Sequence, residues 1–162
     1  MGLLIFYALI SIIFSFLCSI VEASFLSITP TFLRMKKNDG KAYAEILEKM
    51  KKKVDQPLIA ILTINTIAHT VGAILVGVQA EKVFSNGGNM VFIVSAIMTL
   101  AILILSEIIP KTIGANYWQS LGNFTARTLQ ALIFPLKYTG ILWIMMHITK
   151  LMGKSPHTGT VS

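Results

Sequence analysis

Residues 3–21 read LLIFYALISIIFSFLCSIV, an unbroken apolar stretch without a single charge. An α-helix of this length rises about 29 Å at 1.5 Å per residue, close to the roughly 30 Å hydrocarbon core of a bilayer. A secretory signal peptide is the competing interpretation, because Val21-Glu22-Ala23 resembles a small-residue cleavage site. However, the N-terminus lacks the basic residues that such a peptide normally carries. The stretch therefore predicts a retained membrane-spanning helix, at about residues 3–28.

The composition of the whole chain agrees with a membrane location. Of its 162 residues 54% are hydrophobic and 13% are charged, and the mean hydropathy is +0.73. Soluble domains carry about 25% charged residues, so the composition argues against a soluble globular domain. The single cysteine, Cys18, rules out an intramolecular disulfide and a multi-cysteine zinc site. Because aromatic residues are few and no alternating polar pattern occurs, a β-barrel is disfavoured. We predict an all-α membrane protein.

Two further apolar stretches predict two more spans, at about residues 57–80 and 90–109. Between the first two spans, residues 34–53 hold eight of the fourteen Lys and Arg residues. By the positive-inside rule this loop is cytoplasmic, which places the N-terminus outside the plasma (inner) membrane and the C-terminus in the cytoplasm. The turn signal Asn38-Asp39-Gly40 divides the loop, so we expect interfacial helices over about 31–53. A juxtamembrane hairpin near anionic lipid explains these charges better than nucleic-acid binding does.

The last apolar segment, about residues 121–152, allows two interpretations. Its longest stretch without Lys or Arg, residues 138–149, gives only about 18 Å of helix. A lysine at mid-membrane costs about 2.5–3.5 kcal/mol, and an internal proline is expected to break the helix. Three basic residues and a proline interrupt the segment: Arg127, Pro135, Lys137 and Lys150. We therefore favour three transmembrane helices with a cytoplasmic juxtamembrane helical belt over a fourth span. Residues 153–162 are polar and are predicted to be a disordered tail.

Polar side chains recur at helical spacing within all three predicted spans. The first span carries one polar stripe: Ser11, Ser15, Ser19 and Glu22. Asn65 and His69 lie one turn apart on the second span, so they share a face. Glu107 follows Ser106 at the end of the third span. Polar groups inside a membrane are expensive, so they are candidates for function, although small hydroxyls more often join helices.

A depth estimate places three of these side chains at one level of the membrane. Ser19, Asn65 and Glu107 each lie roughly 8–12 Å above the cytoplasmic boundary when counted from the expected entry points. Hydroxyl, amide and carboxylate oxygens are the hard ligands that Mg²⁺ or Ca²⁺ prefers. Pro110 removes a helix hydrogen bond and can leave nearby carbonyls free to line an ion site. These residues predict a divalent-cation site within the membrane.

Three motifs resemble, in order and spacing, those of the transmembrane domain (DUF21) of the CorC/CNNM family of divalent-metal transporters. Ser19-Ile20-Val21-Glu22, followed by Ser27, is similar to the family's FSxxE…S element. Asn65-Thr66-Ile67-Ala68-His69 stands where the family has NTxxN, and residues 106–111, SEIIPK, are similar to its GExxPK signature. The Glu-x-x-Pro-Lys element is the most specific of the three. The resemblance covers residues 1–152.

The resemblance implies a homodimer that exports Mg²⁺ by cation exchange, with Na⁺ as the counter-ion and without an organic cofactor. It also implies a set of site residues, carried over position by position. The metal ligands are Ser19, Asn65, His69 and Glu107, and the supporting residues are Glu22, Pro110 and Lys111.

Two departures from the family pattern affect the expected ion. His69 replaces an oxygen donor with an imidazole, which suits Mn²⁺, Co²⁺ or Zn²⁺ better than Mg²⁺. The imidazole can instead donate to a neighbouring group or add pH dependence near neutrality. Ser106 replaces the family's Gly and adds a side chain near the carboxylate. The sequence also lacks CBS domains, which usually follow in the family, so it is either a fragment or a stand-alone membrane domain.

A non-transporting membrane scaffold is the main alternative to a transporter. In that interpretation the basic hairpin binds a separate cytoplasmic regulatory partner. An intramembrane enzyme is disfavoured, because the chain contains no His-Glu-x-x-His element, no Gly-x-Ser-x-Gly element and no phosphate loop. We therefore predict a divalent-cation transporter without enzymatic activity.

Overall fold

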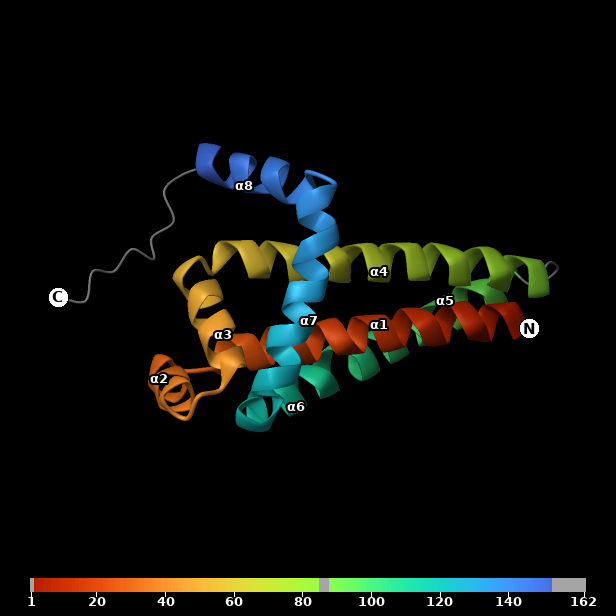
Figure 1. Ribbon diagram of the computed structural model, residues 1–162. Helices are drawn as coiled ribbons and strands as arrows, with labels where there is room; N and C mark the ends of the chain where they lie inside the picture. Colours follow the sequence, from red (N-terminus) through yellow and green to blue (C-terminus); the bar gives the residue numbers. More distant parts are fainter. Residues whose placement is uncertain (1, 85–87, 153–162) are drawn as a thin grey trace.

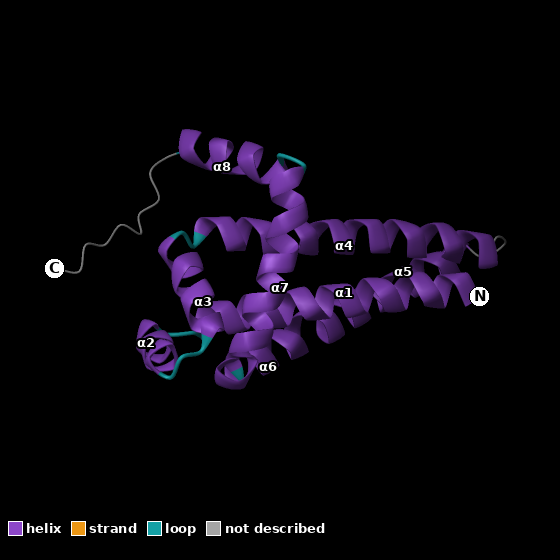
Figure 2. Ribbon diagram, viewed as in Figure 1, coloured by secondary structure: helices purple, strands orange, loops and turns teal. Residues whose placement is uncertain are grey.

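The computed structural model describes residues 2–84 and 88–152, and within these ranges it contains helices and no strand (Figure 2). The predicted tail, residues 153–162, lies outside the described residues. The helices follow one another in this order: α1 Gly2–Ser27, α2 Pro30–Asn38, α3 Ala42–Lys52, α4 Asp55–Val83, α5 Gly88–Leu103, the π-helix η1 Ile104–Ile108, α6 Ile109–Asn116, α7 Trp118–Tyr138 and α8 Ile141–Leu151.

Three rods in this order are long and apolar enough to cross a membrane. They are α1, α4, and the continuous segment Gly88–Asn116 that consists of α5, η1 and α6. The three run side by side in Figure 1, with the beginning of α1 and the end of α4 at one end and α2 and α3 at the other. We call the end with α2 and α3 the basic end. The prediction of an all-α membrane protein is confirmed.

The distribution of side chains on these rods is that of a membrane protein. Ser15 and Ser19 of α1 are fully buried, whereas Ile13 on the same helix is 58% exposed and Ile97 on α5 is 60% exposed. Continuous exposed apolar faces are rare on soluble monomers. A hydrocarbon environment stabilises this arrangement, because it solvates Ile and Leu and leaves hydroxyls to pair with one another.

Helix α1 is the central rod, and glycines allow its neighbours to approach it closely. A Cβ atom on Gly114 of α6 would lie 2.6 Å from the carbonyl oxygen of Ile20 and 2.9 Å from the Cβ of Ala23. On the α4 side, a Cβ atom on Gly72 would lie 1.9 Å from the Ser11 hydroxyl oxygen. Gly114 thus brings the backbone of α6 against that of α1, and Gly72 makes room on α4 for the side chain of Ser11, as small residues commonly do between membrane helices.

At the basic end, α2 and α3 form the expected hairpin. Pro30 occupies the first turn of α2, and the Thr29 hydroxyl accepts a hydrogen bond from the backbone N–H of Phe32 at 3.3 Å, a standard N-cap. The turn contains Gly40, whose φ of +73° is accessible to glycine without strain. The Lys37 ammonium donates to Glu48 at 2.7 Å across the hairpin. Residues 31–53 thus form two short helices joined by a tight turn.

The segment 121–152, for which we expected interfacial helices, folds as two helices bent by 87° to each other. Helix α7 crosses α1 and α4, and α8 turns away from it next to α4 (Figure 1). The bend occurs at Gly140, which has a φ of +71°. The expected break at Pro135 was wrong: α7 continues through this proline to Tyr138. Only one turn follows Pro135, so a single missing hydrogen bond near the helix end is tolerated.

Candidate functional site

A polar cluster joins the middle of α1 to the middle of α4. The Ser15 hydroxyl donates to the Asn65 side-chain oxygen at 2.8 Å and also contacts Nε2 of His69 at 2.7 Å. Asn65 and His69 lie one turn apart on α4, so both face the same stretch of α1. Ser15 is fully buried and Asn65 is 7% exposed, so the hydrogen bonds form in a medium with little competing water.

The hydrogen bonds of Ser15 bear on the role of the His69 ring nitrogen, which depends on the tautomer of the imidazole. A serine hydroxyl has one proton and two lone pairs. With that proton on the side of Asn65, the Ser15 oxygen can accept a hydrogen bond from a protonated Nε2 of His69. In this arrangement Nε2 is a donor and has no lone pair for a metal ion.

The third rod adds a carboxylate to the cluster. Oε1 of Glu107 lies 3.3 Å from Nε2 of His69, so the imidazole connects α4 to η1. The side chains of His69 and Glu107 are 25% and 32% exposed. The rest of the chain therefore covers both side chains only in part.

Glu107 lies on a π-helical turn, and the proline that follows explains this turn. The backbone N–H of Ile109 bonds to the carbonyl of Ile104, a five-residue step instead of four. Pro110 has no N–H, and its ring would clash with the carbonyl of Ser106 in a regular helix. The wider turn removes that clash, and such turns are frequent at functional sites. Ser106 is fully buried and donates to the carbonyl of Ile102, so its hydroxyl bonds to its own helix.

A second acidic group lies closer to the basic end. Oε2 of Glu22 on α1 is 3.5 Å from Nζ of Lys111 on α6, an ion pair too loose for a hydrogen bond. Between this pair and the central cluster, the buried hydroxyl of Ser19 has no hydrogen-bond partner among the described residues. Buried polar groups without a partner are rare in native proteins. The polar face of α1 therefore continues from Ser15 through Ser19 to Glu22.

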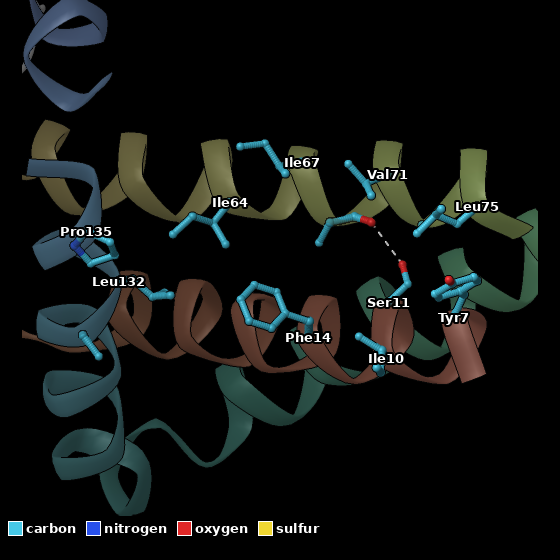
Figure 3. A pocket seen from close by; sticks show the side chains of 13 residues that line it. Tyr7, Ile10, Ser11, Phe14, Ile64, Ile67, Val71, Leu75, Leu132 and Pro135 are labelled. Carbon is cyan, nitrogen blue, oxygen red and sulfur yellow. Dashed lines mark hydrogen bonds between the residues drawn. The ribbon is translucent and has the colours of Figure 1, made fainter. Parts of the chain in front are cut away.

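An apolar groove lies beside this cluster, between α1, α4 and α7. Its volume is about 610 Å³, and Figure 3 shows Phe14, Ile64 and Leu132 pointing into it. The Ser11 hydroxyl, on the wall of the groove, donates to the carbonyl of Ala68 at 3.0 Å. Because Phe14, Ile64 and Ala68 are chain neighbours of Ser15, Asn65 and His69, the groove and the polar cluster lie against the same stretch of the α1–α4 contact.

Of the four predicted ligands, the structure brings together Asn65, His69 and Glu107. Ser15 contacts both Asn65 and His69, and His69 contacts Glu107. Ser19 lies one turn beyond Ser15 on α1. The sequence prediction did not include Ser15, although its place in the stripe with Ser19 was the available signal. Across the described ranges 2–84 and 88–152, no three His, Cys, Asp or Glu side chains gather closely enough to hold a metal ion. A metal site here would need neutral oxygen donors beside the carboxylate of Glu107.

Comparison with known proteins identifies the family. Residues 5–162 match the family model described as the CNNM, or cyclin M, transmembrane N-terminal domain. The chain belongs to the CNNM family. Similar CNNM relatives include a UPF0053 protein from Synechocystis, which is 30% identical over 82% of this chain. The UPF0053 inner membrane protein YfjD of Escherichia coli is 25% identical over 81% of it, and a UPF0053 protein of Haemophilus influenzae is 28% identical over 80%.

The match covers only part of each relative. The chain spans 37% of the Synechocystis protein and 30% of each of the other two. What these comparisons establish for this chain is a CNNM membrane domain, which agrees with the three apolar rods and with a membrane protein of the transporter type.

Proposed function

We propose that this chain transports divalent cations, with Mg²⁺ as the leading substrate. The single observation that carries the proposal is the carboxylate of Glu107, which lies on a π-helical turn within an apolar rod and faces His69 at 3.3 Å. An ionisable group inside a membrane span is expensive, and such groups mark ion pathways in transporters. The resemblance at residues 106–111 and the family match support the same function.

The ion would bind where three rods meet. The proposed ligands are the hydroxyl of Ser19, the side-chain oxygen of Asn65 and the carboxylate of Glu107, with His69 as the fourth. The orphaned hydroxyl of Ser19 supports this assignment, because a bound cation would give that buried oxygen the partner it lacks. Binding would require the Glu107 carboxylate to exchange its contact with His69 for a contact with the cation.

Three neighbouring residues would support the site. Pro110 imposes the wide turn that carries Glu107. Glu22 and Lys111 form the loose ion pair between Ser19 and the basic end, so opening this pair would connect the site to that side. A low count of charges at the site favours release, because one carboxylate neutralises only half of a dication. We infer that efflux proceeds by exchange for a monovalent cation such as Na⁺.

The proposed setting is a homodimer in the plasma (inner) membrane. The eight Lys and Arg residues of segment 34–53 favour a cytoplasmic location of the basic end by the positive-inside rule. The N-terminus would then lie outside and the C-terminus inside.

Metal-dependent thermal stabilisation of the purified protein tests the site. Wild type, Glu107→Gln and the matched control Glu81→Gln are compared in Mg²⁺, Mn²⁺, Co²⁺ and Zn²⁺. A ligand at a hundred times its Kd stabilises by about 2.7 kcal/mol, so wild type and the control should melt several degrees higher with the preferred ion. Glu107→Gln keeps the side-chain shape and removes the charge, so it should lose this gain. If all three proteins respond alike, the site is wrongly assigned.

A transport measurement separates the proposal from the scaffold alternative. The observation that favours a scaffold is the contact between His69 and Glu107, which gives the carboxylate a partner from the protein itself. Proteoliposomes that enclose a Mg²⁺-sensitive dye should show flux with wild type and not with Glu107→Gln. A dimer that binds no metal and carries no flux would instead support a scaffold.

A further inference from the structure

A second hollow lies at the basic end, where α3 ends, α4 begins and α7 passes beside them. Its volume is about 440 Å³. It is lined by Lys49, Met50, Lys52, Lys53, Gln56 and Ile133. Half of the lining residues are lysines and none is acidic. This hollow is separate from the polar cluster and from the apolar groove, with which it shares no residue.

Protein carboxylates neutralise these lysines only weakly. Lys49 pairs with Glu45 at 3.2 Å, but both side chains are more than half exposed, and such pairs contribute little. Glu48 lies near Lys52, but its carboxylate accepts a hydrogen bond from Lys37 at 2.7 Å. Lys52 and Lys53 form no ion pair with any residue in the described part of the chain. The hollow therefore carries an uncompensated positive charge.

The intervening lysine faces the opposite way and fixes the end of α3. Nζ of Lys51 lies 4.7 Å above the ring of Phe25 and 3.5 Å from the carbonyl oxygen of Leu26, at the end of α1. Its desolvation lowers the pKa of the Lys51 ammonium below the usual value. Because this contact ties α3 to α1, the lysines on either side of Lys51 are held at the rim of the hollow.

The remaining walls show what kind of anion fits. Met50 and Ile133 give the hollow an apolar side, and Gln56 adds a neutral hydrogen-bonding group. Ile133 belongs to α7, the helix that crosses the rods near the basic end (Figure 1). A lysine rim beside apolar walls, at the end of membrane-spanning helices, matches a phosphate that carries hydrocarbon rather than a fully hydrated ion.

We propose that this hollow binds the phosphate headgroup of an anionic phospholipid. Lys52 and Lys53 pair with the phosphate, Gln56 donates to its oxygens, and Met50 and Ile133 contact the glycerol and the first methylenes. The lipid would join α3, α4 and α7 at the membrane surface. This site does not depend on metal transport.

Lipid titration of the purified full chain in detergent tests the proposal, with thermal stabilisation as the readout. The probes are phosphatidylglycerol, phosphatidylcholine and inorganic phosphate. The test variants are the double variant Lys52→Gln/Lys53→Gln and the single variant Gln56→Glu, which places a negative charge in the hollow. The matched control is Lys41→Gln/Lys82→Gln, which removes the same charge from exposed positions elsewhere.

Phosphatidylglycerol should stabilise the wild type, and phosphatidylcholine and inorganic phosphate should not. Since each lysine near an anionic surface contributes about 1 kcal/mol, the double variant should bind phosphatidylglycerol about thirtyfold more weakly, and Gln56→Glu should also weaken binding. The control should stay close to wild type. An equal loss in the control would show that net charge alone is responsible. Equal stabilisation by inorganic phosphate would show a free-anion site. Either result overturns the proposal.

Discussion

Nε2 of His69 lies 3.3 Å from Oε1 of Glu107, and the same nitrogen contacts the Ser15 hydroxyl at 2.7 Å. A protonated imidazole nitrogen donates hydrogen bonds and cannot bind a metal ion at that atom. A cation at this site would therefore compete with His69 for the carboxylate of Glu107. We therefore expect residue 69 to influence which ion the proposed site prefers.

His69→Asn should change the order of metal preference. An amide oxygen is a harder ligand than imidazole, so the variant should favour Mg²⁺ over Mn²⁺, Co²⁺ and Zn²⁺ more strongly than wild type does. The measurement is the shift in melting temperature that each ion produces. His147→Asn is the matched control, because His147 stacks on Trp143 of α8, far along the chain from the cluster. An unchanged order of ions in His69→Asn would remove His69 from the ligands.

The sequence predicted the three rods because an uncharged apolar stretch of nineteen residues or more is stable in few environments other than the core of a bilayer. It also predicted that Asn65 and His69 share a face, which follows from helical periodicity alone. It did not predict that Ser15 joins them, because the rotation of α1 relative to α4 is set by close contacts such as that of Gly72 with Ser11. Relative rotation of two helices is a property of packing that neither sequence pattern contains.

The ion pair between Glu22 and Lys111 should stabilise the contact of α1 with α6. Lys111→Met would leave the Glu22 carboxylate, 14% exposed, without a counter-charge. Since Lys111 is 44% exposed, the solvent-screened cost should be about 1 kcal/mol, or about 2–4 °C in melting temperature. The charge-swapped double variant Glu22→Lys/Lys111→Glu should recover part of that loss. Without any recovery, the two side chains do not act as a pair.

The orientation of the chain can be tested with single cysteines. In a Cys18→Ser background, Lys41→Cys lies in the hairpin turn and Glu81→Cys lies at the opposite end of α4, and both positions are exposed. A membrane-impermeant maleimide should label Glu81→Cys in intact cells and Lys41→Cys only after permeabilisation. The opposite pattern would reverse the orientation that the positive-inside rule predicts.

The hairpin should lose stability in acid. The hydrogen bond from Lys37 lowers the pKa of the Glu48 carboxyl below 4.5, its ordinary value. Because the folded-state pKa is the lower one, the stabilisation is complete above pH 4.5 and is lost as the pH falls through the folded-state value. Lys37→Met should therefore melt slightly lower than wild type at pH 7, and the difference should disappear in acid. Lys41→Met, which has no ion pair in the described residues, should show no such pH dependence.

The sequence patterns did not predict the π-helical turn or the position of the bend between α7 and α8. Pro110 predicted a missing hydrogen bond, but whether the helix kinks, ends or widens depends on what packs against it. The turn widens here because α6 remains against α1 through Gly114. At Pro135 the same rule predicted a break that did not occur, since the chain turns five residues later at Gly140.

Gly114→Ala should be the most damaging small substitution on α6. Its Cβ would lie 2.6 Å from the carbonyl oxygen of Ile20, a backbone atom that cannot rotate away, so α6 would have to move from α1. Overpacking of this kind typically costs about 1–3 kcal/mol, and the shift would also move Glu107, seven residues earlier on the same rod. Gly77→Ala on α4 is the matched control, because its Cβ would meet nothing within 4 Å and alanine favours the helix. Gly114→Ala should melt several degrees lower and respond less to metal ions, whereas Gly77→Ala should melt at or above the wild-type temperature. Equal melting temperatures would mean that α6 does not depend on this close contact for its place beside α1.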